Sequence, residues 1–145
     1  MIKIGIDVGS TTAKLVAVDE NDNLLFSKYE RHNAKAKETI LSFLKELLSE
    51  IGDKDISVRI TGSIGMGISE KCSLPFVQEV VAAAKAIQKD YSHVTSMIDI
   101  GGEDAKVVFF NDAEATDLRM NGNCAGGTGA FIDQMAIILG VNIDE

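Results

Sequence analysis

The feature that most limits how this chain can fold is a short internal repeat whose two copies carry the same chemistry. The segment Ile6–Lys14 reads IDVGSTTAK, and 92 positions later Ile98–Lys106 reads IDIGGEDAK, with five of nine residues identical. Both copies alternate apolar and polar residues before a glycine, as a strand does when it enters a tight turn, and both return with Ala-Lys. The repeat therefore predicts two hairpins of the same design within one chain.

The residues around each copy indicate that the repeat belongs to a larger unit. Apolar residues in the first part alternate as in strands or follow helical spacing, which gives the order βββαβα. The expected elements are strands over residues 2–8, 13–18, 24–29 and 56–60, and helices over 36–51, around Ser69 and over 77–88. After Ser96 the order restarts, with strands over 97–100, 105–110 and 115–120 and then a helix that carries Phe131 and Met135. We predict an α/β chain of repeated βββαβα units with the second truncated, so that residues 1–94 form a first domain and residues 95–145 begin a second.

Composition narrows the class of protein. Apolar residues make up 46% of the 145 residues and charged residues 25%, which is typical of a globular domain and not of a disordered chain. The net charge of −8 and the lack of a Lys/Arg cluster argue against nucleic-acid binding. The longest apolar stretch, Met135–Val141, is far shorter than the roughly 20 residues that span a bilayer, and no secretory signal opens the sequence. With only two cysteines and no Cys-x-x-Cys pair, we expect a reduced, cytoplasmic protein.

Each expected hairpin combines residues that suit a bound polyphosphate. Glycines in a turn allow backbone N–H groups to converge on an anion, hydroxyl side chains add donors, and lysine adds positive charge. In the first copy the candidates are Asp7, Gly9, Ser10, Thr11, Thr12 and Lys14, and in the second Asp99, Gly101, Gly102, Glu103, Asp104 and Lys106. One copy alone is also compatible with an ordinary glycine-rich turn capped by an aspartate. Two matched copies that face each other would clamp a polyphosphate.

The aspartate at the end of each first strand indicates a divalent cation. Asp7 or Asp99 alone would repel a phosphate, but a Mg²⁺ ion held through water can lie between carboxylate and phosphate. The sequence has no Gly-x-x-x-x-Gly-Lys-[Ser/Thr] motif, and its turns join strand to strand, which excludes a P-loop. We predict a nucleotide and Mg²⁺ site built by the two hairpins.

These motifs on repeated units resemble those of the acetate and sugar kinase, Hsp70 and actin superfamily of ATPases. Within it, the chain is similar to the activators (component A) of 2-hydroxyacyl-CoA dehydratases, the BadF/BcrA-type ATPases. The resemblance rests on Gly5–Lys14, on Asp99–Lys106 and, most specifically, on Met120–Phe131, which reads MNGNCAGGTGAF. It implies two ribonuclease-H-like domains that close over ATP or ADP and Mg²⁺.

The same resemblance implies an ATPase that works as a homodimer. The family shares one [4Fe-4S] cluster between two subunits, and ATP hydrolysis drives a low-potential electron into the partner dehydratase. By position, Cys124 would ligate the cluster. The position of Cys124 just before an expected helix agrees with this role, because free N–H groups at a helix N-terminus favour a thiolate or an anionic cluster. Cys72 matches no such motif and is expected in the core.

Two departures from the family pattern affect the expected activity. Better-known activators have Gln where this chain has Glu103, a carboxylate that could act as a base or hold Mg²⁺ through water, close to Asp99. The family's second cluster cysteine and its adenosine-binding glycines have no counterpart in these 145 residues. We expect residues 1–145 alone to hydrolyse ATP poorly and to hold no complete cluster.

Two other functions use the same fold. One is a small-molecule kinase, which would need a catalytic aspartate on the substrate side and no cluster. The other is a nucleotide-dependent binding module of the Hsp70 or actin type. Among weaker candidates, His32 and His93 are expected to be solvated or capping residues, and Gly62–Gly67 suits either the edge of a nucleotide cleft or a plain loop.

Overall fold

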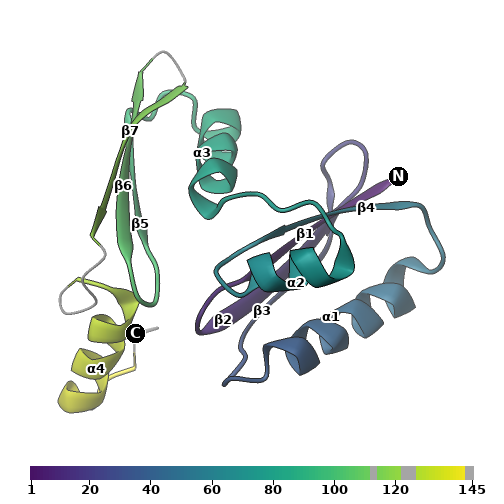
Figure 1. Cartoon of the computed structure of the whole chain (residues 1–145), viewed down its shortest axis with the longest axis horizontal. Coiled ribbons are helices and arrows are strands. Elements are labelled where there is room, and N and C mark those ends of the chain that lie inside the picture. The colour runs from purple at the N-terminus through teal and green to yellow at the C-terminus, as the bar shows by residue number, and fades with distance from the viewer. Residues whose placement is uncertain (112–113, 122–126, 143–145) are drawn as a thin grey trace. The chain divides into compact units, whose positions relative to one another are not determined.

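The computed structural model describes residues 1–111, 114–121 and 127–142, and the chain divides into two compact units, Met1–Glu79 and Val80–Glu145. Each unit is described by itself (Figure 1). The first contains β1 (Ile2–Val8), β2 (Thr12–Val18), β3 (Leu24–Arg31), α1 (Ala36–Ile51), β4 (Ile56–Thr61) and α2 (Gly65–Cys72). The second contains α3 (Glu79–Asp90), β5 (Ser96–Ile100), β6 (Ala105–Asn111), β7 (Glu114–Asn121) and α4 (Gly129–Leu139).

The first unit is built on one four-stranded sheet with the order β3-β2-β1-β4. Strands β1, β2 and β3 form an antiparallel meander, and β4 returns parallel to β1 after helix α1. Beyond β4, Phe76 adds a parallel bridge to Ile60. The carboxyl end of β1 therefore lies between the first hairpin turn and the end of β4.

One face of this sheet forms the core of the first unit. Alternate residues of β1, such as Ile4, Ile6 and Val8, are buried against Phe43 and Leu47 of α1. Helix α2 packs on the same cluster through its apolar side chains, and both helices flank the sheet in Figure 1. The intervening residues of β1, including Asp7, point to the opposite face. The two helices therefore cover the face of the sheet opposite to the one that carries Asp7.

The second unit is an antiparallel meander with the order β5-β6-β7 and a small core. Val108 and Phe110 of β6 are buried with Ala84 of α3, and Met97 packs beside them. Because α3 packs on β6, it groups with the second unit, whereas the sequence placed the domain division after it, at residue 94. Along α4, no residue is buried among the described residues.

The expected strands, helices and their order are confirmed, with boundaries that differ by one or two residues. The helix expected from Val77 begins at Glu79. The cause is the backbone of the preceding segment: Ile60 N–H donates to the Pro75 carbonyl at 3.0 Å, and Val77 N–H donates to the Ile60 carbonyl at 2.8 Å. These bonds hold residues 75–77 extended beside β4. No helix in the described part of the chain is long and apolar enough to cross a membrane.

Candidate phosphate and magnesium site

The first hairpin turns tightly after Val8. Asp7 lies opposite Lys14 in the register of β1 and β2, and Gly9 N–H donates to the Thr12 carbonyl at 3.0 Å. Ser10 and Thr11 form the tip of this turn. We expected a glycine conformation here, but Gly9 is not among the residues with positive φ, and a Cβ atom would meet only the Thr12 carbonyl at 3.8 Å. The turn itself therefore does not require glycine at this position.

The Asp7 carboxylate is bound on one side only. Its Oδ2 atom accepts a hydrogen bond from Lys14 Nζ at 3.0 Å, and the Lys14 ammonium also lies 5.4 Å from the centre of the Tyr29 ring. Its Oδ1 atom is buried without a hydrogen-bond partner among the described residues. The Thr61 hydroxyl, on the directly paired residue of β4, is in the same condition. Two polar oxygen atoms thus lie on neighbouring strand ends with bonding capacity left over.

The loop after β4 packs against the first turn and supports it. Ile64 N–H donates to the Val8 carbonyl at 2.9 Å. Gly62 has φ 94°, and a Cβ atom on it would lie 2.3 Å from the Val8 carbonyl oxygen, so only glycine fits. The segment Gly62–Gly67 is therefore not a plain loop, since Gly62 packs against the first turn and α2 begins at Gly65. Its place at the edge of a nucleotide cleft stays a prediction.

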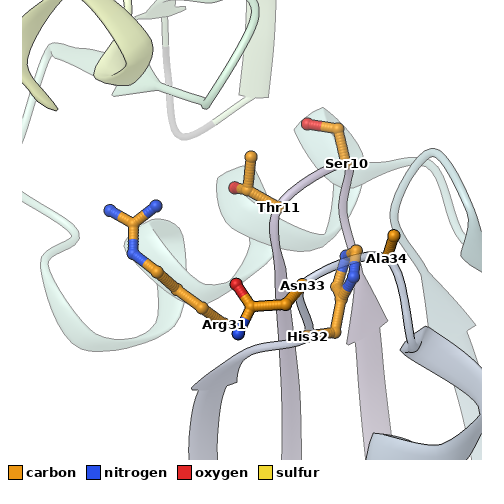
Figure 2. A pocket seen from close by; sticks show the side chains of 6 residues that line it. All are labelled: Ser10, Thr11, Arg31, His32, Asn33 and Ala34. Atoms are coloured by element: carbon orange, nitrogen blue, oxygen red, sulfur yellow. The ribbon is translucent and has the colours of Figure 1, made fainter. Parts of the chain in front are cut away.

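His32 supports the same turn from the other side. Of the two roles expected for it, the solvated one is wrong, whereas its contact with the Gly9 carbonyl is that of a capping residue. The side chain is only 4% exposed, and its Nε2 atom lies 3.0 Å from the Gly9 carbonyl oxygen. A pocket beside it is lined by Ser10, Thr11, Arg31, His32, Asn33 and Ala34 (Figure 2). Sequence reasoning missed this residue because the bond joins positions 23 apart. His93, in contrast, is exposed as expected.

The second hairpin repeats the register of the first. Asp99 lies opposite Lys106 in β5 and β6, and Gly101 N–H donates to the Asp104 carbonyl at 2.9 Å. Each of these positions is the first-hairpin position displaced by the repeat length. Glu103 lies exposed in this turn, next to Gly102. The two copies of the sequence repeat therefore also share their backbone geometry.

The lysine of the second hairpin has a different carboxylate partner. Lys106 Nζ forms an ion pair with Asp104 Oδ2 at 2.9 Å, and the Lys106 side chain is buried. The Asp104 carboxylate folds back over Gly101, where a Cβ atom would lie 2.5 Å from its Oδ1 atom. Gly101 is therefore needed for space, not for a positive φ. Thr12 occupies the place of Asp104 in the first copy and carries no charge.

The N-terminus of α4 docks on the second turn. Gly129 N–H donates to the Gly101 carbonyl at 2.8 Å, and Ala130 N–H donates to the Gly102 carbonyl at 3.1 Å. We expected free N–H groups at this helix start, and that expectation is wrong for these two groups. The cluster ligand proposed from the sequence, Cys124, lies outside the described residues.

The other cysteine is not a core residue. Cys72 is exposed at the last position of α2, where Ser73 adopts a left-handed conformation and ends the helix. The expectation that it is buried was therefore wrong. In the described ranges, no group of three or more His, Cys, Asp or Glu side chains is arranged to hold a metal ion.

Comparison with known proteins identifies relatives along nearly the whole chain. The activator of 2-hydroxyisocaproyl-CoA dehydratase from Clostridioides difficile is 31% identical over 158 residues, which cover 100% of this chain and 55% of the relative. The crystal structure of component A of the Acidaminococcus fermentans (R)-2-hydroxyglutaryl-CoA dehydratase has a TM-score of 0.84 at 28% identity, covering 98% of this chain and 55% of that one. The 2-hydroxyisocaproyl-CoA dehydratase activator with bound ADPNP has a TM-score of 0.83 at 29% identity, covering 98% of this chain and 53% of that one.

These matches confirm the expected actin/Hsp70-type ATPase fold and the resemblance on which it was based. The chain spans just over half the length of these relatives. The model of the BadF/BadG/BcrA/BcrD ATPase family matches residues 4–145. The chain therefore belongs to the BadF/BadG/BcrA/BcrD ATPase family.

Proposed function

We propose that the two hairpins bind the phosphate groups of ATP or ADP together with Mg²⁺, as parts of an ATPase. The observation that carries this proposal is their common geometry, with an aspartate opposite a lysine and the glycine N–H bonded across the turn. A duplicated turn of this form suits a ligand with several phosphate groups. The bound ADPNP of one relative supports the choice of nucleotide.

The proposed phosphate contacts come from donors at the two turns. Hydroxyl groups and backbone N–H groups would donate to phosphate oxygens, and lysine ammonium groups would balance their charge. In the first hairpin the donors would be Ser10, Thr11, Thr12 and Lys14, and in the second Gly102 and Lys106. Gly9 and Gly101, whose N–H groups are bonded across the turns, would contribute by shaping them. Asp104 would act on phosphate only indirectly, because its carboxylate holds Lys106.

The proposed magnesium site has support on the Asp7 side. The buried, unpartnered Oδ1 atom of Asp7 and the neighbouring Thr61 hydroxyl offer the oxygen ligands that Mg²⁺ or its bound water prefers. Asp99 would supply the equivalent carboxylate from the second hairpin. When bound, Mg²⁺ would neutralise phosphate charge. Lys14 holds the other oxygen of Asp7 and so orients the carboxylate.

For hydrolysis we propose Glu103 and Asp99 as the catalytic carboxylates. Glu103 is exposed in the second turn, so its carboxylate is accessible to a water molecule. A carboxylate in this place can accept a proton from that water or orient it. Asp99, on the strand just before the turn, would hold a second water or the cation.

In a protein of the relatives' full length, we propose that this ATPase activates a 2-hydroxyacyl-CoA dehydratase by transferring an electron to it. Two of the relatives, an activator of 2-hydroxyisocaproyl-CoA dehydratase and component A of (R)-2-hydroxyglutaryl-CoA dehydratase, support this kind of partner. A [4Fe-4S] cluster, shared in a homodimer, would supply the electron, with Cys124 as the ligand from this part of the chain. Because four thiolates are needed, the other ligand of each subunit would lie outside these residues. We place the protein in the cytoplasm.

The test is an anaerobic preparation of the full-length protein, with iron and sulfide determined for the wild type and two single variants. Cys124→Ser should lose the iron, whereas Cys72→Ser, which removes the exposed cysteine of α2, should retain it. Hydrolysis of ATP that depends on Mg²⁺ should accompany the wild-type cluster. Full iron content in Cys124→Ser would overturn the cluster assignment. Phosphorylation of an added small molecule without bound iron would instead indicate a kinase.

A further inference from the structure

The first turn is tied to the segment that follows β3 by two hydrogen bonds from one residue. His32 donates its backbone N–H to the Thr11 carbonyl at 3.1 Å, and its ring lies 3.0 Å from the Gly9 carbonyl. In Figure 2 the ring projects from the end of β3 toward the turn that carries Ser10 and Thr11. One buried residue, through its backbone and its ring, therefore holds both ends of the tip of this turn.

The chemistry of this contact sets the protonation of the ring. A carbonyl oxygen only accepts hydrogen bonds, so Nε2 must carry a proton. Nδ1 is buried without a partner among the described residues, and a second proton there would be buried without an acceptor. The geometry thus corresponds to a ring that donates from Nε2.

These bonds also remove two groups that would oppose an anion. The carbonyl oxygens of Gly9 and Thr11 carry partial negative charge and would repel a phosphate if they pointed at it. Both are engaged by His32. The hydroxyl groups of Ser10 and Thr11, which can donate, remain beside the pocket.

The backbone after His32 is strained in a way that favours this arrangement. Asn33 and Ala34 have φ of 48° and 64°, in the left-handed region that side chains other than glycine rarely adopt. Lys35 N–H closes the turn on the His32 carbonyl at 2.7 Å. Such conformations persist only where the surrounding contacts hold them, and they are concentrated at functional sites.

We propose that His32 is a positioning residue for the phosphate-binding turn, acting through the Gly9 and Thr11 carbonyl groups and not by contact with the nucleotide. The inference rests on the proposed function, because it assigns His32 to the same nucleotide site. Loss of the ring donor would free the Gly9 carbonyl oxygen, which could then face the phosphates, while the Thr11 carbonyl keeps its bond to the His32 backbone.

The test compares three single variants of the full-length protein by titration with MgADPNP. His32→Phe keeps a ring but removes the donor, and we expect its dissociation constant to rise about tenfold, as for one lost hydrogen bond. His32→Gln offers an N–H at a similar reach and should recover most of that loss. His93→Gln removes the exposed histidine and should bind as the wild type does.

A second measurement reads the ring directly and needs no variant. In ¹H–¹⁵N spectra of histidine-labelled wild type, His32 should show a slowly exchanging proton fixed on Nε2, while the ring protons of the exposed His93 should exchange rapidly with water. A wild type that binds no MgADPNP would overturn the proposed function. If the wild type binds MgADPNP, a folded His32→Phe protein with the same affinity would overturn this inference but not the proposed function. A His32 ring protonated at Nδ1 alone would do the same.

Discussion

The two hairpins share a register but differ in what covers them. In the first, Ile6 and Val8 are 5% and 0% exposed beneath α1 and α2, whereas their repeat partners Ile98 and Ile100 are 70% and 52% exposed. Backbone geometry is therefore set locally, by alternation and by the turn, and it forms with or without a packed apolar face. Burial depends on helices that lie elsewhere in the sequence.

The two turns are also supported differently. The first rests on the loop at Gly62 and on His32, and the second on the N-terminus of α4 through Gly129. The first lysine pairs with an aspartate on the opposite strand, and the second with an aspartate in its own turn. The two hairpins thus share the strand–glycine–strand backbone, whereas the contacts that support each turn are different.

The largest expected difference between the hairpins is in the cost of removing an equivalent isoleucine. Ile6→Ala should lower the free energy of unfolding by about 2–5 kcal/mol, because it leaves a cavity in the core. Ile98→Ala should change it by less than about 1 kcal/mol in the 145-residue chain, since most of that side chain already contacts water. Urea unfolding of both variants measures the difference. Equal losses would show that the exposed face of β5 is packed after all.

A second comparison tests the support of the first turn. Gly62→Ala should cost about 2–4 kcal/mol, because its Cβ atom would clash with the Val8 backbone and φ is positive there. Gly67→Ala is the matched control within α2, where nothing lies within 4 Å, and it should stabilise by about 0.5–1 kcal/mol. The melting temperatures of the two variants should move in opposite directions. A neutral Gly62→Ala would mean that the loop does not hold the turn.

The smallest expected difference concerns the two ion pairs. Asp104→Asn should destabilise by about 1–3 kcal/mol, because it removes a carboxylate that forms an ion pair with the buried Lys106 side chain. Asp7→Asn should change stability by less than about 1 kcal/mol, since the Lys14 end of that pair is half exposed. Chemical denaturation at neutral pH checks both values. The reverse order would mean that the pairing in the second hairpin is not structural.

The sequence was sufficient for the fold but not for the details of the site. The alternation of Ile4, Ile6 and Val8 predicts a strand with one buried face, and the repeat predicts the shared register of both hairpins. These patterns involve residues that are close in the sequence, so they can be recognised in one sequence without a structure. The grouping of α3 with the second unit depends on packing against β6, which no local pattern records.

The missed contacts all join residues that are distant in sequence. In the sequence, His32 is an isolated histidine among polar residues, and only its position after β3 in the fold brings its ring to the Gly9 carbonyl. The sequence predicts free N–H groups at Gly129 and Ala130, but in the fold the carbonyl groups of the second turn accept hydrogen bonds from both. One signal was available: Asp104 stands where the first copy has Thr12, and that added carboxylate marks the different partner of Lys106.

The central claim is that both hairpins together hold the magnesium nucleotide, and the most direct test is calorimetric titration of MgADPNP into the full-length protein and its single variants. Asp7→Asn and Asp99→Asn should each weaken binding by about tenfold or more, and each should reduce the gain in affinity that Mg²⁺ gives the wild type. Asp53→Asn, at an exposed site after α1, should bind as the wild type does. Wild-type affinity in either the Asp7 or the Asp99 variant would contradict a site shared by the two hairpins.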